Sequence, residues 1–223
     1  MDTKARKVLV VGATGGSGVA VVEQLLSQGH EVTAFARHAE RLQARFPELK
    51  IINGNAMNPT EVESAVQGQD AVIVTLGISE NPVQVRLFGS SHTPLDVRSA
   101  GTRNVIAAMR KHQVRKLVVL SSYGVGESRN KLPLATKLMF ALLLKPQIAD
   151  TEKQESLIRT SGLDWVIAQP VHLTNGYAHG QLFLSPAGKV RRMKISRGQV
   201  ARFLAEAAGI NTYVGRSVAL STT

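Results

Sequence analysis

The chain alternates between short apolar runs and longer stretches in which apolar residues recur every three or four positions. The short runs are typical of buried strands, and the recurrence is typical of amphipathic helices. The short runs predict strands at residues 7–12, 30–37, 49–55, 70–77, 115–122 and 163–170. The recurring stretches predict helices at residues 16–29, 40–46, 58–68, 94–113, 149–162 and 197–209. Residues 216–221 are expected to add a final edge strand.

Strands that alternate with helices indicate a parallel sheet with helices on both faces. The sequence therefore predicts an α/β fold: one Rossmann domain over residues 1–223, with a doubly wound, mostly parallel sheet of six to seven strands. Asn58 is expected to cap a helix that has Pro59 at its first position. The substrate region is expected to form from the loops 78–93, 123–145 and 174–189.

Residues 132–145, within these loops, are apolar almost all round. The segment is too short to span a bilayer. A buried helix, a subunit interface and a lid over an apolar ligand are the alternatives for it. The sequence leaves the oligomeric state open between monomer and dimer.

The composition favours a globular protein, because 43% of the 223 residues are hydrophobic and the mean hydropathy is near zero. No apolar run is long enough for a membrane span, and the one after "MDTKARK" is too short for a signal-peptide core. The chain has no cysteine, which excludes disulfides and thiolate metal sites. The histidines show no metal-ligand spacing, so no metal site is expected. A cytoplasmic location is the simplest expectation.

The net charge of +11 favours anionic ligands such as dinucleotides, acidic tetrapyrroles, nucleic acid or a membrane surface. A solvated basic surface is the alternative. Two basic clusters stand out, at residues 110–116 and 189–197. Aromatic residues make up only 4% of the chain and do not interleave these clusters, which disfavours a nucleic-acid partner.

Three glycines directly after the first predicted strand, Gly12, Gly15 and Gly18, open the first predicted helix. In this context a G-x-x-G-x-x-G motif indicates a dinucleotide site. The first glycine permits a tight turn, the second lets the backbone approach a pyrophosphate, and the third lets the helix pack closely on the sheet. The helix N-terminus attracts the phosphates. The predicted cofactor-binding residues in this turn are Gly12, Ala13, Thr14, Gly15, Gly16, Ser17 and Gly18.

The end of the second predicted strand reads "FARHAER" and carries no carboxylate at the strand tip. NAD-specific Rossmann folds place Asp or Glu there to bind the ribose 2′-OH, whereas an arginine suits the 2′-phosphate of NADP. The sequence therefore predicts NADP(H) as cofactor, contacted by Arg37, His38 and Arg41. The alternative is that the arginines are solvated residues at a helix start, with Glu40 as partner of one of them.

The other strand tips are expected to line the rest of the cofactor, because the carboxyl ends of parallel strands meet at one edge of the sheet. Asn55 is a candidate near the adenine, or else a simple turn residue. The predicted cofactor contacts from the tips are Asn55, Ala56, Thr75, Leu76, Gly77, Ser121, Ser122, Pro170, Val171 and His172.

Several segments together resemble atypical short-chain dehydrogenase/reductases of the NmrA-like, NAD(P)-binding group: "VVGATGGSG", "DAVIVTLG", "GTRNVIAAM" and "SGLDWVIAQP". The resemblance covers nearly the whole chain in order. Within the group it is strongest to the NADPH-dependent flavin and biliverdin reductases of the biliverdin reductase B type. It implies that Ser122 lies near the nicotinamide and that His172 follows the last strand of the site, both as candidate catalytic residues.

The sequence departs from most short-chain dehydrogenases in lacking their Tyr-x-x-x-Lys pair. Aligned with the family, those two positions fall on Gln147 and Thr151, or on Ala149 and Lys153 in a shifted register. Alcohol oxidation by that pair is therefore disfavoured. The expected function is NADPH-dependent reduction of a conjugated small-molecule acceptor, namely a flavin, a biliverdin-like tetrapyrrole or a quinone. The alternative is a non-catalytic NADP(H)-binding redox sensor or scaffold.

Overall fold

The computed structural model describes residues 5–78, 93–131, 145–176 and 180–223. The apolar segment 132–144 and most of the predicted loop 78–93 therefore lie outside the described residues. None of the helices within the described ranges combines the length and the apolar character that crossing a membrane requires.

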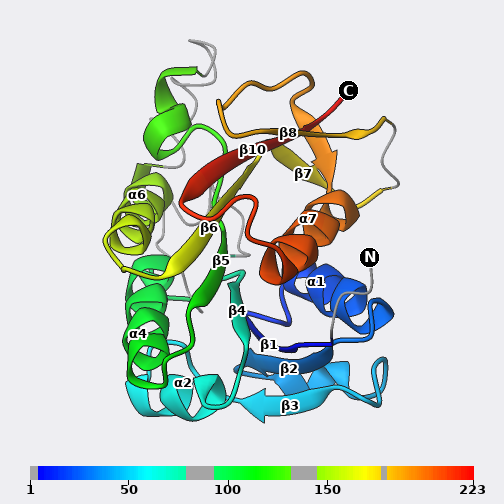
Figure 1. The fold of residues 1–223 in the computed structure, drawn as a ribbon, viewed down its shortest axis with the longest axis vertical. Helices are drawn as coiled ribbons and strands as arrows, with labels where there is room; N and C mark the ends of the chain where they lie inside the picture. The colour runs from blue at the N-terminus through cyan, green and yellow to red at the C-terminus, as the bar shows by residue number, and fades with distance from the viewer. Residues whose placement is uncertain (1–4, 79–92, 132–144, 177–179) are drawn as a thin grey trace.

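A central sheet of eight strands has the order β3-β2-β1-β4-β5-β6-β10-β8 (Figure 1). All neighbours pair in parallel except β8, which runs antiparallel to β10. A second, two-stranded parallel sheet joins β7 to β9. The strands are β1 Lys7–Val11, β2 Glu31–Ala36, β3 Lys50–Asn53, β4 Ala71–Val74, β5 Lys116–Leu120, β6 Asp164–Pro170, β7 His172–Thr174, β8 Leu182–Ser185, β9 Lys194–Ser196 and β10 Arg216–Thr222.

Helices cover both faces of the large sheet (Figure 1). Helices α1 and α7 pack together over one face, and α2, α4 and α6 cover the other. Alternate side chains of β1 enter the two cores, with Val8 and Val10 on the first face and Leu9 and Val11 on the second. The α-helices are α1 Gly16–Ser27, α2 Pro59–Val66, α4 Val97–Lys111, α6 Lys145–Arg159 and α7 Arg197–Gly209. Two 3₁₀ turns, η1 Ala39–Leu42 and η2 Gly126–Lys131, complete the described elements.

The predicted fold class, an α/β Rossmann fold with a mostly parallel sheet and helices on both faces, is confirmed. Local signals are confirmed as well. The Asn58 side chain accepts a hydrogen bond from the Thr60 N–H, and Pro59 is the first residue of α2. The predicted helix at 40–46 forms only a 3₁₀ turn, in which the Asn53 side chain accepts the N–H of Ala39.

The sheet has eight strands rather than the six to seven expected, and β10 is not at its edge. The reason is β8, which forms inside the predicted loop 174–189 and pairs with the outer side of β10. The sequence "LFLS" is too short to show the alternation that marks a strand. The loop 174–189 is thus partly a strand.

Candidate functional site

The glycine turn after β1 shows which of its glycines the protein itself requires. Gly12 has a φ of +85°, in the left-handed region that favours glycine. A Cβ on Gly18 would overlap the Gly12 carbonyl oxygen and lie 2.9 Å from the Ala13 Cα. Both positions therefore need glycine for the turn and for the packing of α1 on β1, as the motif predicts.

Gly15 is different, because the packing does not require its missing side chain. A Cβ there would meet only the Gly12 carbonyl oxygen among the described residues, at an ordinary 3.5 Å, and its φ of −71° suits any residue. Gly15 is the N-cap of α1, no side chain caps this helix, and its first turn holds no acidic residue. The exposed backbone of Thr14, Gly15 and Gly16 thus leaves an uncovered helix N-terminus, which fits a phosphate group.

The residues after β2 lie on the surface. Arg37 is exposed, and its Nη2 donates a hydrogen bond to the Thr93 hydroxyl at 3.2 Å. The ion pair recorded for Glu40 is with His38, at 3.5 Å, and not with an arginine. Arg41 is exposed, and its side chain makes no hydrogen bond or ion pair with another described residue. This end of β2 therefore presents a guanidinium group that the described fold does not use.

Several predicted contacts at the neighbouring strand tips serve the fold. The Asn55 side-chain oxygen accepts the Met57 N–H at 3.0 Å, so Asn55 stabilises the turn that follows β3. The Thr75 hydroxyl lies within hydrogen-bond distance of the carbonyls of Val11 and Gly12, which ties β4 to the glycine turn. Ala56 and Leu76 are buried, whereas Gly77 is exposed.

The tips of β5 and β6 run side by side past the ends of the strands. The Ser121 N–H donates to the Ala168 carbonyl at 2.8 Å, and the Tyr123 N–H donates to the Pro170 carbonyl at 2.9 Å. Ser122 is therefore held beside the end of β6. That strand ends at Pro170, two residues before His172. Its hydroxyl is half-buried and has only a long 3.4 Å contact with the Tyr123 carbonyl.

His172 is exposed at the start of β7, and its ring makes no hydrogen bond with another described residue. Its neighbour Val171 is buried. The structure thus places Ser122 and His172 on adjacent strand tips, with side chains that the described fold leaves available.

Ser121 faces the opposite way and joins a buried polar network. Its hydroxyl donates to Glu155, a fully buried residue of α6, at 2.5 Å. The same carboxylate accepts hydrogen bonds from Gln169 at 2.8 Å and from Arg159 at 2.9 Å. The Ser121 hydroxyl therefore fixes β5 to α6, which leaves only its backbone for the predicted cofactor contact.

Two arginines at this edge of the sheet were missed by the sequence analysis. Arg98, in the first turn of α4, places its Nη2 2.9 Å from the position that a Cβ on Gly77 would take. Burial lowers the pKa of the Arg98 guanidinium, and the nearby Asp150 opposes that shift. Arg197, the first residue of α7, lies against Gly16. A basic residue in the first turn of a helix opposes the helix dipole, and this was the signal available in the sequence.

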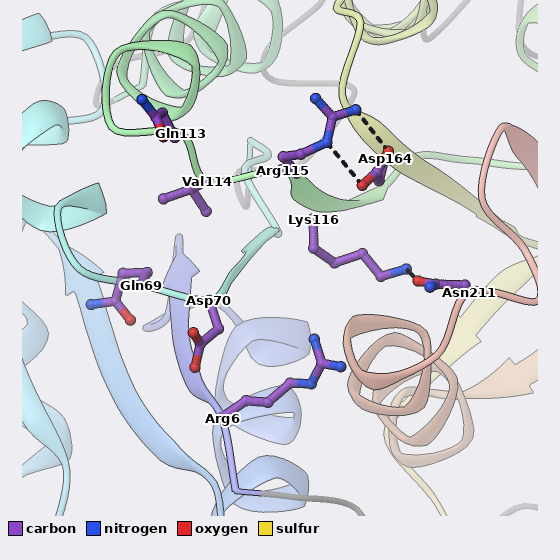
Figure 2. A pocket seen from close by; sticks show the side chains of 9 residues that line it. All are labelled: Arg6, Gln69, Asp70, Gln113, Val114, Arg115, Lys116, Asp164 and Asn211. Atoms are coloured by element: carbon purple, nitrogen blue, oxygen red, sulfur yellow. Dashed lines mark hydrogen bonds and ion pairs between the residues drawn. The ribbon is translucent and has the colours of Figure 1, made fainter.

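A cavity of about 370 Å³ lies at the other edge of the sheet, where β4, β5 and β6 begin. Figure 2 shows the side chains that line it. Arg115 forms a two-pronged ion pair with Asp164, at 3.2 and 3.0 Å, and holds the pKa of that carboxyl below its usual range. The Lys116 amine donates to the Ile210 carbonyl and to the Asn211 side chain. Burial lowers the pKa of this lysine. The cavity is lined by Arg6, Gln69, Asp70, Gln113, Val114, Arg115, Lys116, Asp164 and Asn211.

A family model described as NAD(P)H-binding matches residues 12–209, which include the glycine turn and most of the strand tips. The chain belongs to this NAD(P)H-binding family. The match covers more than half of the chain, and the Rossmann architecture agrees with an atypical short-chain dehydrogenase/reductase type. NAD(P)H binding is thus a property of the family.

Relatives and solved structures agree with this membership. An uncharacterized chloroplastic protein of Arabidopsis thaliana is 31% identical over 207 residues, covering 92% of this chain and 72% of the relative. A 2-alkyl-3-oxoalkanoate reductase of Stenotrophomonas maltophilia is 35% identical over 124 residues; that match spans 53% of this chain and only 34% of the reductase. The chain therefore matches about a third of that enzyme's length.

Among solved structures, ChuY of Escherichia coli O157:H7, described as an anaerobilin reductase, has a TM-score of 0.78. It is 23% identical, and the match covers 97% of each chain. A short-chain dehydrogenase/reductase of Veillonella parvula in complex with NADP has a TM-score of 0.76 at 19% identity, over 97% of this chain and 94% of that one. At these identities the likeness shows the shared fold alone.

Proposed function

We propose that this protein is an NADPH-dependent reductase of a conjugated small-molecule acceptor, namely a flavin, a biliverdin-like tetrapyrrole or a quinone. The observation that carries the proposal is the pair Ser122 and His172. They lie on adjacent strand tips at the cofactor edge, and the described fold leaves both side chains available. The resemblance to flavin and biliverdin reductases supports the same reaction.

The proposed cofactor is NADP(H) rather than NAD(H). Arg37 and Arg41 lie at the end of β2, where the ribose of the adenosine half binds in Rossmann folds. A planar guanidinium pairs well with a 2′-phosphate, and no carboxylate follows the strand directly. The exposed backbone around Gly15 is the proposed seat of the pyrophosphate. The remaining proposed cofactor contacts are those at the strand tips named above, with Thr75 and Ser121 acting through their backbone carbonyls, because their N–H groups donate within the sheet.

For this reaction the protein needs to position the cofactor and the acceptor and to supply one proton. NADPH supplies a hydride, and the acceptor also takes up a proton. The Ser122 hydroxyl would hold the nicotinamide carboxamide or the acceptor in contact geometry. A ring nitrogen of His172 would donate the proton to the reduced acceptor or stabilise its negative charge, the role that histidine most often takes in general acid–base catalysis.

The described residues offer no tyrosine–lysine pair as an alternative acid. At the aligned positions of α6, the Thr151 hydroxyl donates to the Gln147 carbonyl within the helix. Tyr123 is buried, its hydroxyl donates to the Gly188 carbonyl at 3.1 Å, and burial raises the pKa of that hydroxyl. Tyr123 is therefore a structural residue. A conjugated acceptor is the class that can be reduced without such a pair.

Charge in the region of β7, β8 and β9 favours an acceptor that carries carboxylates or a phosphate. Residues 165–205 contain no Asp or Glu. Within it, residues 189–194 expose four cations, and Arg191 lies over the ring of Phe183 at 4.4 Å. The exposed cations are Lys189, Arg191, Arg192 and Lys194. These residues, with the loops 78–93 and 123–145, form the proposed acceptor region of one Rossmann domain.

The test mixes purified protein and NADPH with FMN, biliverdin or a quinone and follows the nicotinamide absorbance. Wild-type protein should consume NADPH, and His172→Ala should lower the rate of consumption about 100-fold, a larger loss than its loss of NADPH affinity. NADPH that binds but is consumed with none of the acceptors would instead favour the sensor or scaffold. The missing tyrosine–lysine pair is the observation that keeps this second function in view.

A further inference from the structure

We propose that Arg197 is a cofactor-binding residue whose guanidinium pairs with the pyrophosphate at the start of α1. The inference rests on the proposal that the glycine turn holds the cofactor. It adds a cation from the other end of the sequence, more than 170 residues after the turn.

The position of Arg197 follows from the packing of two helices. Helices α1 and α7 lie side by side on one face of the sheet (Figure 1). Arg197 is the first residue of α7, and its side chain crosses over the first residue of α1. A Cβ on Gly16 would lie 3.1 Å from Arg197 Nε and 3.4 Å from its Cδ. Glycine at position 16 thus leaves room for the arginine as well as for a ligand.

The charge of Arg197 is poorly placed for the fold alone. It lies near the positive ends of two helix dipoles, those of α1 and of its own helix, where a cation is unfavourable. No described carboxylate forms an ion pair with it. It is not needed as a cap, because Ser196 and Gln199 form a capping box at the start of α7. An anion bound between the two helix N-termini would offset the repulsion, because it attracts both the guanidinium and the helix dipoles.

The pyrophosphate is the anion that this place would receive. The glycine turn directs the uncovered N-terminus of α1 to the same point, and a guanidinium forms two parallel hydrogen bonds with phosphate oxygens. The pyrophosphate is common to NADPH and NADH. Arg197 should therefore contribute to the binding of both, unlike Arg37, whose proposed partner is the 2′-phosphate.

Arg197 also links the phosphate turn to the candidate proton donor. Its Nη1 donates to the side-chain oxygen of Asn175, which directly follows β7. His172 is the first residue of β7, and β9 pairs with β7 directly before Arg197. The arginine thus spans the gap between the cofactor phosphates and the strand that carries His172.

The test compares Arg197→Gln and Arg197→Ala with Arg202→Ala in the intact protein. Arg202 is an exposed arginine more than one turn further along α7, so the control removes the same charge. The measurement is the Kd of NADPH and of NADH at one fixed salt concentration. Both Arg197 variants should weaken both dinucleotides by a similar factor, about 10- to 100-fold, as expected for hydrogen bonds to a charged group. Arg202→Ala should change neither Kd more than about twofold.

Two outcomes would overturn the assignment. Unchanged Kd values in folded Arg197→Gln would remove the contact, and a loss confined to NADPH would move the arginine to the 2′-phosphate. Thermal unfolding of each variant shows that it is folded; the glutamine variant retains a donor for Asn175 if alanine does not fold. The readout is independent of turnover. Wild-type protein that binds NADPH but reduces no acceptor would therefore contradict the proposed function, whereas the Kd values of the Arg197 variants would still test the role of Arg197.

Discussion

The carboxyl edge and the amino edge of the sheet both carry charged side chains, but the carboxyl edge also presents two arginines, Arg41 and Arg197, that form no ion pair with a described carboxylate. At the amino edge, Arg115 is paired with Asp164, and Lys116 closes the end of α7 through the Ile210 carbonyl. At the carboxyl edge, Arg41 has no described side-chain partner. A cavity lined mainly by polar and charged residues lies at the amino edge, but these charged groups already form ion pairs or hydrogen bonds within the protein (Figure 2).

This difference supports the proposal that the carboxyl edge binds the ligand, whereas the charged groups of the amino edge stabilise the fold. A charge that donates to backbone carbonyls or to an ion pair is already compensated, and removing it costs stability. A charge held near a helix N-terminus without a carboxylate is compensated when an anion arrives. Cations without a described carboxylate partner thus support a ligand site at the carboxyl edge, although the cavity of Figure 2 is at the other edge.

Substitutions within the glycine turn should show the largest effects. Gly15→Val should weaken NADPH binding more than about 100-fold, because the side chain occupies the proposed phosphate seat, while the fold tolerates it. The matched variant Gly18→Ala should instead lower the free energy of unfolding by about 1–3 kcal/mol, because its Cβ overlaps the turn. Dinucleotide titration and urea unfolding of both variants give the comparison. Retained NADPH affinity in Gly15→Val would move the site away from the turn.

A smaller effect is expected at the end of β2. Arg37→Ala should raise the Kd of NADPH about 10- to 100-fold and leave that of NADH within about twofold, because only NADPH carries the 2′-phosphate. The two dinucleotides are titrated in parallel at the same salt concentration. Equal losses for both would deny Arg37 a role in cofactor preference.

At the amino edge, the effect should fall on stability alone. Lys116→Met should lower the free energy of unfolding by about 1–3 kcal/mol, because the partly buried Ile210 carbonyl loses its donor. The NADPH Kd of the variant should match that of wild type, as measured in the same titration. A large change in that Kd would mean that the two edges are not separate in function.

The smallest effect is the pH dependence of the ion pair at the cavity. Arg115 lowers the pKa of Asp164 in the folded state, so the stabilisation is fully present above the ordinary value of 3.8 and is lost as the pH falls through the lowered value. Asp164→Asn should therefore be less stable than wild type at neutral pH, and the two should converge in acid. Urea unfolding over this pH range checks it. A constant difference at all pH values would leave the ion pair without a role in acid stability.

The comparison also shows what the sequence could reveal. The glycine turn and the cap at Asn58 were predictable, because each follows from residue types at fixed spacing. The small sheet of β7 and β9 was not, because strands of three residues show no periodicity. The direction of a side chain also escaped prediction: Ser121 and Ser122 are neighbours, yet only Ser121 is engaged by Glu155, a residue from a distant helix.

Titration of isotope-labelled protein with NADPH, followed through its backbone amide resonances, distinguishes a cofactor site at the glycine turn from one at the amino edge. A cofactor site at the glycine turn predicts that the amide resonances of residues 12–18 shift as NADPH binds. It also predicts that the amides of residues 113–116, which line the cavity of Figure 2, stay unchanged. Shifts at the cavity with an unchanged glycine turn would contradict it.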